Sequence, residues 1–112
     1  MSATVSTHVL DARVGAPARG LAVRLEPCGP GGAPLAEGRT DGDGRLRDWH
    51  DPAAVDPGDF RLVFDTGGYF AALGVAAFYP EVAVAFTVTE AGGHYHVPLL
   101  LSPFAYSTYR GS

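Results

Sequence analysis

The chain of 112 residues has the length of one domain and carries a formal net charge of −4. Its eight basic residues are all arginines spread along the sequence, so there is no basic stripe to bind a nucleic-acid backbone and no lysine for Schiff-base chemistry. The single cysteine, Cys28, excludes an internal disulfide and a zinc site built from several thiolates, and we interpret it as a spectator thiol.

Nothing in the sequence indicates a membrane segment or a secretory leader. No apolar run approaches the roughly 20 residues that a helix needs to span a bilayer. The first residues, Met1 to Thr4, lack the charged and apolar regions of a signal peptide. We therefore expect one domain over residues 1–112 that is soluble and cytoplasmic, with no nucleic-acid or membrane partner.

Short apolar or alternating runs, separated by glycine, proline and aspartate clusters, favour an all-β sandwich or barrel. The predicted strands, in chain order, cover residues 4–11, 21–27, 34–40, 45–48, 59–66, 81–90, 95–101 and 105–109. Residues 69–74 differ because they are helix formers followed by a glycine stop, and they predict one short helix between two strands.

Alternation along two of these strands predicts which side chains face the core. In the late strand, Tyr95, Val97, Leu99 and Leu101 form the apolar set, so His94, His96, Pro98 and Leu100 point the other way. In the first strand, Val5, Thr7 and Val9 lie on one face and Thr4, Ser6, His8 and Leu10 on the other. Two strands thus present histidine side chains on the face away from the core. Leu10 and Leu100 lie on the same face, which favours a surface covered by another subunit.

The central segment, residues 40–45, has the aspartates and glycines of a tight turn that leads Arg45 into a short strand. It is not a calcium loop, because it lacks the glycine at the sixth position and the glutamate at the twelfth. The turn by itself leaves open whether Arg45 is functional. Beyond it, we interpret Trp49 as a packing residue and His50 as a surface residue.

The histidines are the residues best suited to chemistry. His94 and His96 share one side of a strand, which suits a zinc or copper site, but no third ligand occurs at suitable spacing and metal binding is the lesser hypothesis. A serine nucleophile elbow and a phosphate-binding glycine loop are both absent from the sequence. If the protein is an enzyme, we expect water to attack and histidine to move protons near neutral pH.

Several longer motifs resemble those of the transthyretin-like family, and in particular of its 5-hydroxyisourate hydrolases. They are Ser6-Thr7-His8-Val9-Leu10-Asp11, Gly15-x-Pro17-Ala18, Thr40-x-x-Asp43-Gly44-Arg45, Phe78-Tyr79-Pro80-Glu81, and the block from His94 to Pro103 followed by Tyr106 to Ser112. The last four residues, Tyr109-Arg110-Gly111-Ser112, resemble the tetrapeptide that marks the hydrolases and that the hormone-carrying transthyretins lack. One departure is Asp41, where family members often have asparagine.

The resemblance implies a sandwich of two four-stranded sheets with one short helix, assembled as a homotetramer, a dimer of dimers, with active sites in the channel between dimers. By the same resemblance the catalytic residues are His8, Arg45, His96 and Ser112. Tyr109, Arg110 and Gly111 would join His8, Arg45 and Ser112 in binding substrate. No metal or cofactor is implied, and His94 and Cys28 receive no role.

The implied reaction is hydrolysis of 5-hydroxyisourate to 2-oxo-4-hydroxy-4-carboxy-5-ureidoimidazoline in urate breakdown. The hypothesis is that His8 and His96 orient and deprotonate a water, in an order the sequence leaves open. Arg45 would hold the carbonyl-rich substrate and stabilise charge on oxygen. Two alternatives remain: a non-catalytic carrier of small aromatic ligands, and a generic interaction module.

Overall fold

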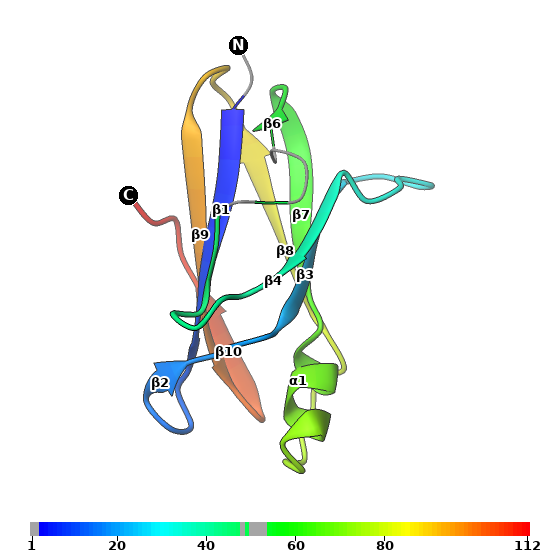
Figure 1. Ribbon diagram of the computed structural model, residues 1–112. Helices are drawn as coiled ribbons and strands as arrows, with labels where there is room; N and C mark the ends of the chain where they lie inside the picture. The colour runs from blue at the N-terminus through cyan, green and yellow to red at the C-terminus, as the bar shows by residue number, and fades with distance from the viewer. Residues whose placement is uncertain (1–2, 48, 50–53) are drawn as a thin grey trace.

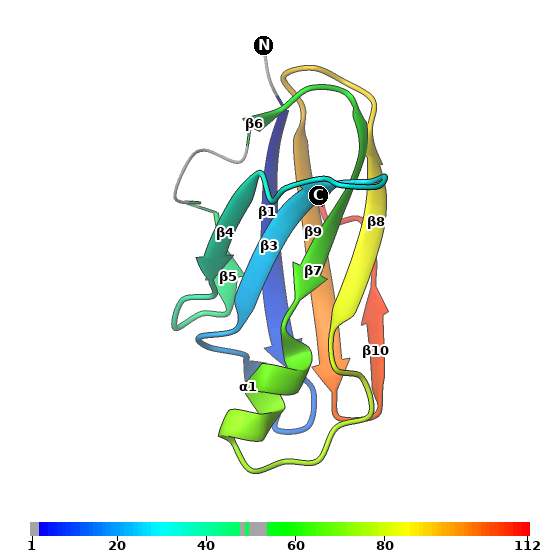
Figure 2. The same ribbon diagram turned by 90° about the vertical axis from the view of Figure 1, so that its right-hand side faces the viewer.

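Two β-sheets pack face to face in the computed structural model, which describes residues 3–47, Trp49 and residues 54–112 (Figures 1 and 2). The second sheet has the order β4 (Ala36–Arg39), β3 (Ala22–Pro27), β7 (Gly58–Phe64) and β8 (Val82–Val88). The first sheet has the order β10 (Ala105–Thr108), β9 (His94–Ser102), β1 (Ala3–Asp11) and β2 (Ala16–Pro17), and β5 (Arg45–Leu46) and β6 (Ala54–Val55) also pair with β1. The predicted two-sheet sandwich is confirmed.

The strand ends differ from the predicted ones because pairing partners set them. β7 and β8 run the same length, from Gly58 opposite Val88 to Phe64 opposite Val82, and so β8 is shorter than the predicted 81–90. β4 begins at Ala36 because its pairing with β3 begins there. β5 ends at Leu46, and Asp48 of the predicted 45–48 lies outside the described residues.

Three two-residue strands, β2, β5 and β6, share the second edge of β1. The sequence predicted no strand at β2 or β6, because two residues are too few to show an alternating pattern. The first sheet is therefore built from two long strands, β1 and β9, with short segments at its margins.

β1 and β9 pair in parallel, although they are about ninety residues apart along the chain. In this register Thr4 lies opposite His94, Ser6 opposite His96 and His8 opposite Pro98. The predicted alternation is confirmed, since Tyr95, Val97, Leu99 and Leu101 of β9 are all at most 6% exposed and belong to the core. The same alternation turns His94 and His96 toward the outer face of this sheet.

The core fills the space between the two sheets. Its largest fully buried side chains include Leu25, Leu62 and Phe64 of the second sheet and Val9 and Leu99 of the first. Each such side chain contributes about 1.5–3 kcal/mol through its removal from water. Trp49 packs into this core and donates its indole N–H to the carbonyl oxygen of Val5 at 2.8 Å, as its predicted packing role requires.

Helix α1 (Thr66–Ala72) caps one end of the sandwich and begins three residues before the predicted 69–74. Asp65 explains the earlier start, because its side chain accepts a hydrogen bond from the backbone N–H of Gly68. The predicted glycine stop is confirmed at Gly74, which has a φ of 69°. No helix of the described residues is long and apolar enough to cross a membrane.

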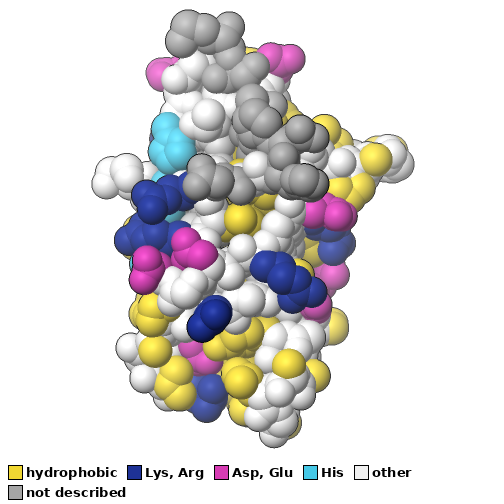
Figure 3. Space-filling view, viewed as in Figure 1, with side chains coloured by type: hydrophobic (Ala, Val, Ile, Leu, Met, Phe, Trp, Pro, Cys, Tyr) yellow, Lys and Arg dark blue, Asp and Glu magenta, His cyan; other side chains and the backbone are white. Residues whose placement is uncertain are grey.

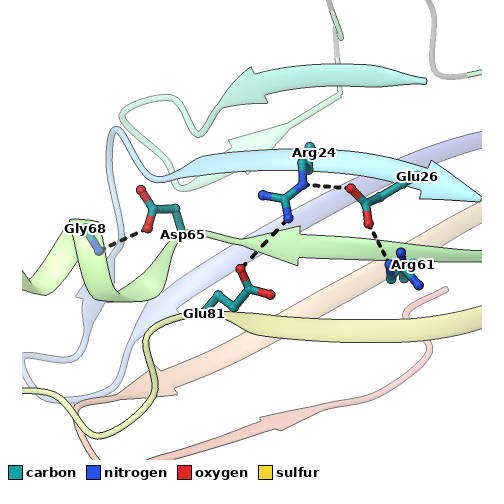
Figure 4. A network of polar contacts seen from close by, with 6 residues as sticks. All are labelled: Arg24, Glu26, Arg61, Asp65, Gly68 and Glu81. Carbon is teal, nitrogen blue, oxygen red and sulfur yellow. Dashed lines mark hydrogen bonds and ion pairs between the residues drawn. The ribbon is translucent and has the colours of Figure 1, made fainter. Parts of the chain in front are cut away.

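The outer face of the second sheet carries a network of ion pairs (Figure 4). Glu26 accepts from Nε of Arg24 at 2.7 Å and from Nε of Arg61 at 2.6 Å, and Arg24 also lies 3.9 Å from Glu81. The hydrogen bond from Arg24, with that from Arg61, lowers the pKa of Glu26 below its ordinary value. These contacts lie on the side of the sandwich opposite the histidines and give the two faces different chemistry.

Candidate functional site

The outer face of the first sheet gathers the predicted site residues. It is formed by β1, β5, β9 and the segment 109–112, and Figure 1 shows the carboxy-terminal segment leaving the sandwich on this side. Figure 3 shows histidine and arginine side chains next to each other along the same side of the molecule. Sequence segments from both ends of the chain and from its middle therefore meet on one surface.

His8 and Arg45 lie directly opposite each other, on β1 and β5. The ring of His8 is held by a hydrogen bond, in which Nε2 donates to the carbonyl oxygen of Asp43 at 2.9 Å. This bond comes from the turn that precedes Arg45, so the same turn orients both residues.

The turn at residues 41–44 is built as the sequence predicts. Oδ1 of Asp41 accepts from the backbone N–H groups of Asp43 at 2.9 Å and Arg45 at 3.0 Å, and the bond from Arg45 is the main reason that the pKa of Asp41 is lowered. Gly44 has a φ of 76° and lies against the carbonyl oxygen of Val9, where a Cβ atom has no room. An aspartate at position 41 thus supplies the acceptor that closes the turn.

His96 is the histidine with the most defined surroundings. Its Nδ1 lies 2.8 Å from the hydroxyl of Ser6, which leaves Nε2 as the ring nitrogen without a hydrogen bond among the described residues. Burial lowers the pKa of His96 below its ordinary 6.5, and the charges of His94, Arg45, His8 and Arg47 lower the pKa further. His96 is therefore neutral at pH 7 and able to accept a proton.

The segment 109–112 is fixed to His96 through the backbone. Gly111 pairs with His96 as an antiparallel bridge and donates its N–H to the His96 carbonyl oxygen at 2.8 Å. A Cβ atom on Gly111 would lie 2.5 Å from Cδ2 of the His96 ring, so only glycine allows this approach. Next to it lies a hollow of about 480 Å³ lined by His94, Tyr109, Arg110, Gly111 and Ser112.

Tyr95 anchors the same segment from the core side. Its hydroxyl accepts from the backbone N–H groups of Thr89 and Glu90 at 3.0 Å each, and Cζ of Arg110 lies 4.7 Å from the centre of its ring. The side chain of Thr89, the backbone hydrogen bonds and the Arg110 charge lower the pKa of Tyr95. The buried ring therefore provides a fixed platform for Arg110.

The structure brings the predicted residues together on one face. His8 faces Arg45, while His96 meets Gly111 and lies two positions along β9 from His94. The terminal residues 109–112 line one hollow with His94.

The other residues singled out from the sequence lie as follows. Cys28 is exposed and free. His50 lies outside the described residues. Within residues 3–47, Trp49 and residues 54–112, no three His, Cys, Asp or Glu side chains are grouped as metal ligands.

Sequence reasoning missed three contributors to the site. Arg47 is exposed two residues beyond Arg45, and its charge acts on His96. Alternation from Arg45 is the signal that could have identified it, because residues two apart share a face. Thr4 and Ser6 were placed on the outer face, but only the register of β1 with β9 reveals that they contact the histidines.

Comparison with known proteins agrees with this geometry. Residues 5–111 match the model of the HIUase/Transthyretin family. The 5-hydroxyisourate hydrolase of Salmonella dublin is 47% identical over 110 residues, which cover 96% of this chain and 80% of that protein.

Two solved structures have the same fold. The 5-hydroxyisourate hydrolase of Klebsiella pneumoniae has a TM-score of 0.85 and 34% identity, with 98% of this chain and 94% of that chain covered. Transthyretin from Sparus aurata has a TM-score of 0.86 and 32% identity, with 96% and 95% covered. The chain belongs to the HIUase/Transthyretin family.

Proposed function

We propose that this protein hydrolyses 5-hydroxyisourate in urate degradation, at the site formed by His8, Arg45, His96 and the segment 109–112. The observation that carries the proposal is the meeting of a half-buried His96, whose pKa is lowered by burial and by neighbours that include Arg45, with the Tyr109–Ser112 segment on one face. The 47% identity with a bacterial 5-hydroxyisourate hydrolase supports the same substrate.

The geometry suits hydrolysis of a cyclic amide by water. Nε2 of neutral His96 would take a proton from the water, whose oxygen attacks C6 of the lactam. The N1–C6 bond then breaks, N1 takes up the proton held by His96, and C6 becomes a carboxylic acid, which releases its proton to solvent to give the carboxylate of 2-oxo-4-hydroxy-4-carboxy-5-ureidoimidazoline. The balance is one water consumed and one amide bond opened.

Arg45 and His8 would handle the substrate's oxygens. The guanidinium of Arg45 offers a planar fork of donors that stabilises charge as it develops on the C6 oxygen. His8 would hold the substrate or the water from a ring whose Nε2 is already fixed to Asp43. Ser112, Tyr109 and Arg110 would close the pocket from the side of the hollow.

Assembly as a homotetramer is part of the proposal. The site lies on an open sheet face rather than in an enclosed cavity, and Leu10 and Leu100 lie half-buried on that face. A second subunit placed over it would cover these leucines and exclude water from the substrate. One domain over residues 1–112, in a cytoplasmic protein, is also part of the proposal, and the apolar core cluster that joins both sheets of the described residues supports the single domain.

The direct test is catalysis of 5-hydroxyisourate decay. The substrate is generated from urate with urate oxidase, the purified protein is added, and the ultraviolet absorbance is followed against a blank without protein. We expect decay to accelerate in proportion to protein concentration. An unchanged decay rate would contradict the proposal.

A carrier of small aromatic ligands is the alternative, supported by the similarity to Sparus aurata transthyretin. It predicts saturable binding of such ligands without any effect on 5-hydroxyisourate. The 47% identity to the Salmonella dublin hydrolase and the Tyr109–Ser112 segment beside His96 favour the enzyme.

A further inference from the structure

Four side chains on the outer face of the first sheet form one hydrogen-bonded chain. Oγ1 of Thr4 lies 2.6 Å from Nδ1 of His94, Nε2 of His94 lies 3.0 Å from Oγ of Ser6, and that same oxygen lies 2.8 Å from Nδ1 of His96. The parallel register produces this alignment, because it sets Thr4 opposite His94 and Ser6 opposite His96.

This hydrogen-bonded chain of side chains connects the interior of the site with solvent. Ser6 is only 2% exposed, and both of its contacts are to histidine rings. His96 is half-buried, whereas His94 and Thr4 are exposed. Because the Ser6 hydroxyl is buried between two imidazoles, it can donate its proton to one ring while it accepts a proton from the other.

The number of protons allows two consistent arrangements. A hydroxyl and a neutral imidazole each carry one mobile proton. In the first arrangement Nδ1 of His96 donates to Ser6, Ser6 donates to Nε2 of His94, and Nδ1 of His94 donates to Thr4. In the second, every bond points the other way and the proton of His96 lies on Nε2. The first arrangement leaves Nε2 of His96 unprotonated, as a general base requires.

We propose that Ser6 and His94 are positioning residues that set the tautomer of His96 and hold the positive charge on His94 while His96 has taken a proton from water. The inference rests on the proposed function, because it needs His96 to be the base. It assigns a role to His94 that neither the motif resemblance nor the local sequence supplied.

The transfer is balanced. When Nε2 of His96 accepts a proton, its Nδ1 proton passes to Ser6 and the Ser6 proton passes to Nε2 of His94. His96 is then neutral with its proton on Nε2, Ser6 is unchanged, and His94 is the cation. When the Nε2 proton of His96 passes to the leaving N1 of the substrate, His94 returns its extra proton through Ser6 to Nδ1 of His96, and the starting arrangement is restored.

The charges around His96 favour this direction. His94 on β9, His8 on β1, and Arg45 and Arg47 from the β5 segment all disfavour a cation on His96, as does burial. Moving the charge to exposed His94 places it in water, where solvation is better. We expect the acid limb of the rate profile to depend on both histidines.

The test compares two variants that interrupt the hydrogen-bonded chain with one that keeps a hydroxyl at position 6. Ser6→Ala removes the bridge, His94→Phe keeps a flat ring without nitrogen atoms, and Ser6→Thr retains an oxygen at the same place. We expect kcat to fall about 10- to 100-fold for the first two, with KM changed less than about twofold, and Ser6→Thr to recover part of the loss. Added imidazole should restore turnover in His94→Phe, because it can accept the proton from Ser6.

The control is Glu37→Gln, which alters an exposed side chain on β4 of the second sheet, away from the histidine face. It should keep normal kcat and KM. If Ser6→Ala and His94→Phe also keep normal kcat and the same pH profile, the inference is wrong. If Ser6→Thr does not fold because Ser6 is buried, His94→Phe, which alters an exposed side chain, still decides the question.

Histidine ring ¹⁵N NMR spectra report the tautomer of His96 and so test the hydrogen-bonded chain without substrate. We expect one tautomer of His96 above its pKa in the unaltered protein and a mixture in Ser6→Ala. Identical His96 spectra in both proteins would overturn the inference. A protein that shows the tautomer change but no hydrolysis would instead contradict the proposed function, so the two failures are distinguishable.

Discussion

His96 combines in one side chain the features that a general base needs. Burial and neighbouring charges lower its pKa, which favours the neutral ring at pH 7, and Ser6 holds its Nδ1 atom by a hydrogen bond. The sequence identified His96 through a motif, but its pKa depends on charges from β1, β5 and β9 together.

Replacing His96 is the first prediction at this scale. His96→Ala should reduce kcat about 10²- to 10⁴-fold, because a positioned base is lost, while KM changes little. Steady-state kinetics of 5-hydroxyisourate decay measures both constants, and a thermal melt shows whether the fold is retained. Normal turnover by a folded His96→Ala protein would remove this residue from the mechanism.

The pH dependence follows from the direction of the shift. The base form of His96 is lost as pH falls through its pKa, and since the pKa is lowered, activity should persist below the ordinary 6.5. Arg47→Ala removes one of the charges that lower this pKa. The acid limb of kcat/KM should therefore move to higher pH in that variant.

The matched control for Arg47→Ala is Arg19→Ala, which also removes one exposed arginine but lies beside helix α1. It should leave the acid limb where it is. Equal profiles for Arg47→Ala and the unaltered protein would show that Arg47 does not act on His96.

At the scale of elements, the turn before β5 is the device that positions Arg45. It joins β5 to β1 through Gly44, whose N–H donates to the Asp41 carbonyl oxygen and whose own carbonyl oxygen accepts from the Val9 N–H at 2.7 Å. The aspartates and glycines of the sequence predicted the turn, but they did not show which glycine the turn conformation requires.

Two glycines of this turn give a matched pair of substitutions. Gly44→Ala should destabilise the protein by more than about 1–2 kcal/mol, because a positive φ is strained for alanine and the Cβ atom would meet Val9. Gly42→Ala should be near neutral, since it has open space and no positive φ. Urea unfolding of both variants measures the difference, and equal midpoints would contradict this account of the turn.

At the scale of the whole molecule, the two faces of the sandwich differ in character. The second sheet presents the Arg24–Glu26–Arg61 network to solvent, whereas the first presents histidines, arginines and the half-buried Leu10 and Leu100. The ion-paired face is suited to water, and the other face is the one on which the proposed subunit contact and the proposed substrate site lie.

The tetramer proposal makes a prediction at this scale. Light scattering of the purified protein should give about four times the chain mass of 11.7 kDa. Leu100→Glu places a charge on the proposed contact face and should lower the measured mass and the activity together, since a desolvated unpaired charge is costly. A monomeric but fully active protein would contradict the assembly.

The sequence by itself determined the class of fold, the inward and outward faces of β1 and β9, the turn at residues 41–44 and the family motifs. These features depend on the alternation of side chains, on turn-forming residues and on short family motifs, all of which involve residues that are neighbours in the sequence. The tertiary structure decided the parallel register that joins Ser6 to His94 and His96, the three short strands on β1 and the influence of Arg47. These depend on contacts between segments distant along the chain, which are set by how the two sheets pack and which no local pattern encodes.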